Sequence, residues 1–142
     1  MLTNRYVHPE MGHIWSEEAK FDSWMEVEIA AAEVMAEAGI IPQDAAREIR
    51  KKANYSIERI DAIEKEVKHD VVAFTQSMAE NVGPAGRFIH FGLTSYDVVD
   101  TALGIRLREA TDLILKNVEK LLSILKERAY THKKTVMVGR TH

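Results

Sequence analysis

The sequence contains no cysteine, which excludes a disulfide scaffold and thiol chemistry among its 142 residues. Only three prolines and seven glycines are present, so little interrupts helix formation. No apolar run approaches the roughly 20 residues needed to cross a bilayer. The formal net charge is −3 and no block of Lys or Arg stands out, so nothing indicates binding to nucleic acid or to a membrane.

The residues that are present are typical of an ordered, soluble domain. Hydrophobic residues make up 46% and charged residues 29% of the chain. The length fits one domain, since domains average on the order of 150 residues. The segment from Met1 to Met11 is polar and lacks the apolar centre of a secretory signal peptide. We therefore expect a soluble, cytoplasmic protein.

The spacing of the apolar residues predicts an all-α fold. Ser16 can cap a first helix, which opens with two glutamates and ends at Gly39. A second helix is expected after Pro42, a third after a cap at Ser56, and a fourth after a cap at Asp70. The face of the first helix that is expected to be buried consists of Phe21, Trp24, Val27, Ala31, Val34, Met35 and Ala38.

A much longer helix is predicted from about Asp97 to Thr131, where no proline intervenes. Roughly 35 residues correspond to ~50 Å, and the shorter helices upstream cannot cover an apolar stripe of that length. We therefore expect neighbouring long helices or further copies of the chain to pack against it. The only candidate for extended structure is Thr135 to Val138. The stripe comprises Val99, Leu103, Leu107, Ala110, Leu113, Ile114, Val118, Leu121, Ile124 and Leu125.

The sequence contains few of the patterns that mark a catalytic or metal site. The six histidines show no metal-ligand spacing and there is no glycine-rich phosphate loop. We therefore expect no metal and no organic cofactor. Polar residues at the predicted helix boundaries remain as candidates, because side chains and free backbone N–H groups converge there.

The first candidate group is Lys68, His69 and Asp70, between the third and fourth predicted helices. A histidine can transfer protons or bind anions near neutral pH. Lys68 and the start of the following helix both favour an anionic ligand. The alternative interpretation is a charged corner that faces solvent.

The second candidate group leads into the long helix and contains His90, Thr94 and Ser95. Two adjacent hydroxyls before a helix N-terminus can bind a carboxylate or a phosphate. The alternative is that Thr94 or Ser95 only caps the helix. A cap needs a single hydroxyl, however, and leaves His90 unexplained.

Two further groups lie near the ends of the sequence. Arg140, Thr141 and His142 offer a cation, a hydroxyl and a titratable ring, although an ordinary polar turn is the alternative. Arg5 and Tyr6 could bind a phosphate, although most such pairs are ordinary surface residues.

Together these segments resemble one family. The chain carries, in order, RYVHPEM, KHDVVAF, HFGLTSYDVVDTA and VMVGRTH, with approximately the spacing of bacterial-type adenylosuccinate lyases. Those lyases belong to the fumarase/aspartase superfamily, whose members share versions of GLTS and GRTH. KHDVVAF together with the N-terminal RY and PEM is what resembles adenylosuccinate lyases in particular. The resemblance runs from Arg5 to His142.

The resemblance implies a small helical N-terminal domain, here 1–93, followed by the incomplete start of a central bundle of long helices, here 94–142. In the family, four subunits form a homotetramer and each active site draws on three of them. The family's mobile loop, with the serine now favoured as general base, lies further downstream. The isolated chain is therefore expected to be inactive.

The implied reaction is elimination of fumarate from adenylosuccinate to give AMP, and from the ribonucleotide SAICAR to give AICAR, in purine biosynthesis. By position in the family, His142 is the general acid and His69 assists catalysis. The implied substrate-binding residues are Arg5 and Tyr6 at the phosphate, Lys68, His69 and Asp70, Thr94 and Ser95 at the succinyl carboxylate with His90 nearby, and Arg140 and Thr141.

Two other functions stay open. Argininosuccinate lyase, aspartase or fumarase also belong to the superfamily, but a substrate without phosphate leaves Arg5 and Lys68 without a role. A non-catalytic helical assembly module would explain the long stripe. It would not explain why His69, His90 and His142 lie at helix junctions.

Overall fold

The computed structural model describes residues 4–140, so Thr141 and His142 lie outside the described residues. Within that range every regular element is helical, which confirms the predicted all-α fold, and Thr135 to Val138 joins no strand. No described helix is long and apolar enough to cross a membrane. The elements are η1 (Asn4–Tyr6), α1 (Pro9–Ile14), α2 (Glu17–Glu37), α3 (Gln43–Lys52), α4 (Ile57–Val67), α5 (Asp70–Val82), η2 (Gly83–Phe88) and α6 (Ser95–Thr131).

Most of the predicted helix ends are confirmed. The Ser16 hydroxyl accepts the Ala19 N–H at 3.1 Å, and Ser56 caps α4 in the same way. Gly39 follows α2 with a φ of 72°, as a C-terminal glycine should. The cap predicted at Asp70 is wrong, because His69 is the extended residue before α5 and Asp70 already belongs to the helix.

The core is formed by residues of α2, α3, α4, α5 and the start of α6, with an aromatic cluster between α2 and α5. Phe74 is fully buried, and its ring stacks on Phe21 with 5.6 Å between the centroids. Trp24 packs edge-on against both rings, with centroids 5.5 Å apart in each pair. Edge-to-face and stacked pairs of this kind add stability beyond the area they bury. The aromatic cluster therefore fixes α2 against the start of α5.

The expected buried face of α2 is only partly correct. Val34 is 63% exposed, whereas Ala32 and Ala36 are buried on the turns beside it. The predicted set mixed two faces of the helix. One face packs on the core, and Ala31 and Val34 on the other line an open groove between α2 and α6. Val27 and Met35 border this groove and also pack against the core.

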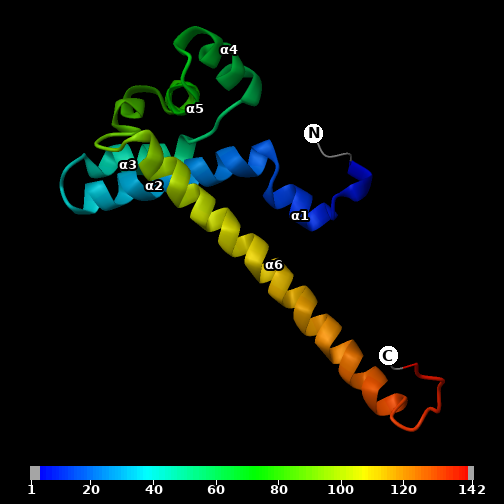
Figure 1. The fold of residues 1–142 in the computed structure, drawn as a ribbon. Coiled ribbons are helices and arrows are strands. Elements are labelled where there is room, and N and C mark those ends of the chain that lie inside the picture. The colour runs from blue at the N-terminus through cyan, green and yellow to red at the C-terminus, as the bar shows by residue number, and fades with distance from the viewer. Residues whose placement is uncertain (1–3, 141–142) are drawn as a thin grey trace.

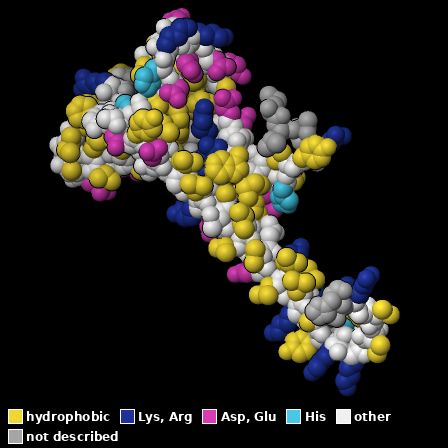
Figure 2. Space-filling model, in the orientation of Figure 1, with side chains coloured by type: hydrophobic (Ala, Val, Ile, Leu, Met, Phe, Trp, Pro, Cys, Tyr) yellow, Lys and Arg dark blue, Asp and Glu magenta, His cyan; other side chains and the backbone are white. Residues whose placement is uncertain are grey.

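The long helix α6 contains 37 residues and extends far beyond the other helices (Figure 1). Its buried residues, Val98, Ala102 and Ala110, all lie in the first half. Of the predicted stripe, Ala110 is buried and Val99 and Leu113 are partly buried. The other seven residues are exposed, from 41% at Leu103 to 56% at Leu125. Figure 2 shows hydrophobic side chains gathered along this helix. The sequence-based expectation that α6 needs further cover is consistent with this exposure.

Gly86 in η2 provides a test of the packing. An alanine Cβ at this position would lie 2.8 Å from the Ala79 carbonyl oxygen, and backbone cannot move aside easily. We expect Gly86→Ala to lower the free energy of unfolding by about 1–3 kcal/mol, measured by urea denaturation of the chain. Gly104→Ala is the control, because nothing lies within 4 Å of its added Cβ. Equal stability of the Gly86→Ala variant and the unaltered chain would contradict this packing.

Candidate active site

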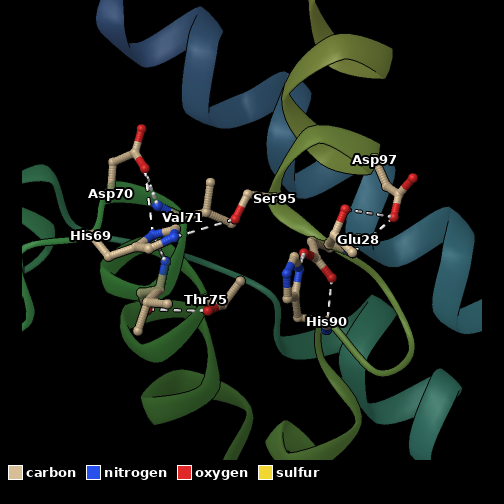
Figure 3. Close-up of polar contacts among 10 residues, drawn as sticks. Glu28, His69, Asp70, Val71, Thr75, His90, Ser95 and Asp97 are labelled. Atoms are coloured by element: carbon tan, nitrogen blue, oxygen red, sulfur yellow. Dashed lines mark hydrogen bonds and ion pairs between the residues drawn. The ribbon is translucent and has the colours of Figure 1, made fainter.

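The junction between α4 and α5 meets the N-terminus of α6 at His69 and Ser95. The Ser95 hydroxyl lies 3.4 Å from His69 Nε2, and the Asp70 carboxylate lies 3.6 Å from His69 Nδ1. Figure 3 shows these three side chains turned toward one another. Two predicted candidate groups, far apart in sequence, are therefore brought together. They line a pocket of about 260 Å³ formed by His69, Asp70, Val71, Ser95, Tyr96 and Val99.

The backbone at this junction sets the direction of the His69 ring. Lys68 adopts the left-handed conformation, with φ 57°, and ends α4. His69 then caps α5, since its Nδ1 accepts the Val72 N–H at 3.4 Å. Nδ1 is unprotonated in this arrangement, so the neutral ring carries its proton on Nε2, toward Ser95. A protonated ring would instead present Nδ1–H to Asp70 and Nε2–H to the pocket.

Thr94 and Ser95 make different contacts at the start of α6. Thr94 forms a capping box with Asp97, whose carboxylate accepts the Thr94 N–H at 2.7 Å. Ser95 instead faces His69. The first N–H groups of a helix have no partner within the helix and favour anions. The sequence reasoning missed Asp97, although its place three residues after Thr94 was the available signal.

His90 makes a contact of its own, with Glu28 of α2. It has a positive φ of 61°, and its ring Nδ1 lies 2.6 Å from Glu28 Oε1. Its backbone N–H donates to the other Glu28 oxygen at 2.8 Å. The sequence reasoning also missed Glu28, which is buried at 1% exposure. A glutamate on the apolar stripe of α2, four residues after Trp24, was the signal for it.

The remaining predicted residues are not brought to this pocket within one chain. Arg5 and Tyr6 pack on each other, with the guanidinium 4.8 Å from the ring centroid, in η1, which is well separated from α5 (Figure 1). Lys68 lines a different hollow, along α4. Arg140 follows the far end of α6, a helix of 37 residues that spans about 55 Å by helix rise. Within residues 4–140 no group of three or more His, Asp or Glu could hold a metal ion.

The sequence profile of a family described as lyase matches residues 4–142. The chain belongs to the lyase family. It is 49% identical to the adenylosuccinate lyase of Bacillus subtilis over 141 residues. The aligned region covers 99% of this chain and 33% of that protein. It is 50% identical to the adenylosuccinate lyase of Streptococcus mutans with the same coverage. These identities confirm the resemblance predicted from the motifs.

Solved structures of related enzymes share the fold of this lyase chain. A fumarate lyase from Mesorhizobium superposes with a TM-score of 0.89 and 29% identity, covering all of this chain and 34% of that one. A β-carboxy-cis,cis-muconate cycloisomerase from Acinetobacter calcoaceticus superposes with a TM-score of 0.84 and 26% identity. That match covers 94% of this chain and 33% of the cycloisomerase chain. The chain thus spans about a third of the length of the curated relatives it matches.

Proposed function

We propose that the intact protein is an adenylosuccinate lyase, which eliminates fumarate from adenylosuccinate to give AMP and from SAICAR to give AICAR. The observation that carries this proposal is the identity of about half of all residues with adenylosuccinate lyases, along 99% of the chain. Identity to the fumarate lyase and the muconate cycloisomerase is lower, at 29% and 26%.

The pocket at the start of α6 has the parts that an elimination requires. Removing a proton next to a carboxylate leaves extra negative charge on that carboxylate in the transition state. The Ser95 hydroxyl and the free N–H groups of α6 are donors that would stabilise this charge, while Thr94 orders the helix start. Such a donor contributes about 3 kcal/mol in well-studied oxyanion sites.

The departing nitrogen needs a proton, and histidine suits that role near neutral pH. We assign His142 as the general acid and His69 as the assisting group, with Asp70 beside it. Arg5 and Tyr6 would bind the phosphate of the nucleotide, together with Lys68. None of these roles requires a metal or an organic cofactor.

The separation of the candidate groups favours a site shared between subunits. Arg140 follows the far end of α6, whose 37 residues span about 55 Å from Ser95, the residue that faces His69. We propose a cytoplasmic homotetramer in which 1–93 form a helical domain and 94–142 begin a shared bundle. The far end of α6 from one subunit would then complete the pocket of another.

The test is to supply the intact protein with adenylosuccinate and to measure fumarate and AMP by chromatography. We expect turnover with adenylosuccinate and no turnover with argininosuccinate, aspartate or malate. Turnover of one of those three compounds instead would refute the proposal. The 142-residue chain alone should give no turnover, because it spans only about a third of its relatives' length.

A further inference from the structure

Glu28 is an ionisable residue in the core that the proposed mechanism leaves without a role. Its side chain is fully buried on α2, among residues that are otherwise apolar or small. Burying a carboxylate is costly unless its oxygens are paired. Both oxygens of Glu28 are paired with one residue, since Oε1 meets the His90 ring and Oε2 accepts the His90 N–H (Figure 3).

This double contact determines which nitrogen of His90 is free. With Glu28 ionised, Nδ1–H donates to its carboxylate oxygen at 2.6 Å, and Nε2 is the nitrogen left for other partners. No side-chain hydrogen bond among the described residues reaches Nε2. Since no buried side-chain nitrogen or oxygen in that part of the chain lacks a partner, Nε2 reaches the surface.

The contact also holds the backbone that leads to the active-site pocket. A positive φ costs a residue with a side chain about 1 kcal/mol, and His90 adopts one while donating its N–H to Glu28. The same loop continues through Gly92, with φ 72°, to Thr94 and Ser95. Glu28 therefore ties the core of α2 to the loop that presents the start of α6.

We propose that Glu28 is a positioning residue, which holds the His90 ring with Nε2 directed to the substrate. This role rests on the proposed lyase function and on the contact of His90 with substrate. Glu28 itself acts only through His90. The substrate group that faces Nε2 is a hydroxyl when the ring is neutral, or an anionic oxygen when the ring is protonated.

Glu28→Gln in the intact protein is the first test. The amide has a single acceptor oxygen, so if that oxygen keeps the His90 N–H, the NH₂ group faces Nδ1. The ring must then move its proton to Nε2 or rotate away. We expect kcat/KM for adenylosuccinate to fall at least about tenfold, since a 1 Å misplacement at an active site can cost about 10²-fold. Glu33→Gln, on the same helix in a half-exposed pair with Arg50, should leave it unchanged.

A double-mutant cycle separates this role from a purely structural one. Adding Glu28→Gln to a His90→Ala protein should cause no further fall in kcat/KM, because the two residues act as one unit. An equal fall in both backgrounds would show that Glu28 acts without His90 and would overturn the proposal. An unchanged kcat/KM in the single Glu28→Gln variant would overturn it as well.

The ring spectrum of the unaltered protein gives a test that depends on no variant folding. In intact protein labelled with ¹⁵N-histidine, the neutral His90 ring should carry its proton on Nδ1. A neutral ring protonated on Nε2 would refute the proposal even if Glu28→Gln does not fold. If the unaltered protein does not release fumarate from adenylosuccinate, the proposed function fails, whereas the ring spectrum still decides whether Glu28 sets the tautomer.

Discussion

Replacing His69 by asparagine is expected to lower kcat for fumarate release from adenylosuccinate by at least 10²-fold in the intact protein. The loss follows because asparagine cannot transfer a proton, and proton transfer by a placed side chain typically contributes about 10²–10⁴-fold. Asparagine is chosen over alanine because His69 caps α5. Asparagine is a strong N-cap residue, so the helix start should be kept or improved. Turnover and thermal unfolding measured together check both halves of the prediction.

His13 provides the matched control, since it is an exposed histidine on α1 outside the proposed site. His13→Asn should leave kcat and the thermal midpoint unchanged. His142→Ala should reduce kcat as strongly as His69→Asn, with assembly intact. Near-normal turnover in both the His69 and the His142 variants would remove the catalytic assignment, whatever their stability.

The fold could be predicted to a large extent because its signals are local. Ser16 and Ser56 are caps whose hydroxyls reach N–H groups three residues later, so short sequence windows contain the whole interaction. The error at α5 has a physical reason. Asp70 is the better intrinsic cap, but the left-handed turn at Lys68 places His69, not Asp70, in the extended position.

The buried face of α2 was harder, because two apolar faces lie on one helix. Val34 and Ala32 are equally acceptable as core residues by spacing. Which one is covered depends on where α5 and α6 pack, and this is a tertiary property. The same reason hid Glu28, since a glutamate among apolar residues is tolerated only when a distant group such as His90 pairs with it.

For the candidate site, sequence patterns selected candidate residues, but which of them lie together within one chain depends on tertiary packing. The meeting of His69 with Ser95, 26 positions apart, depends on the packing of α5 beside the start of α6. The motif resemblance placed both groups on one substrate. Nothing local in the sequence indicates that His90 contacts Glu28, or that Arg5 is remote from His69 within one chain.

The apolar stripe of α6 leads to the second large expected effect. Leu121→Glu combined with Leu125→Glu should prevent assembly of the intact protein. Both leucine side chains are more than half exposed in the single chain, so we expect neighbouring helices to cover them in the assembly. Glutamates at these positions would place two charges in that apolar contact. Turnover should fall by at least about 10²-fold, because an unassembled subunit lacks the general acid supplied by another copy. Sedimentation and fumarate release measure the two consequences.

The control variant changes the net charge by the same amount, but on the opposite side of the helix. Lys116→Gln combined with Ser123→Glu also makes the chain more negative by two, but both positions point away from Leu121 at about 100° per residue. That variant should assemble and turn over normally. If the Leu121 and Leu125 variant sediments as a monomer and keeps full turnover, each pocket is complete within one subunit. That result would overturn the proposal that the site is shared between subunits.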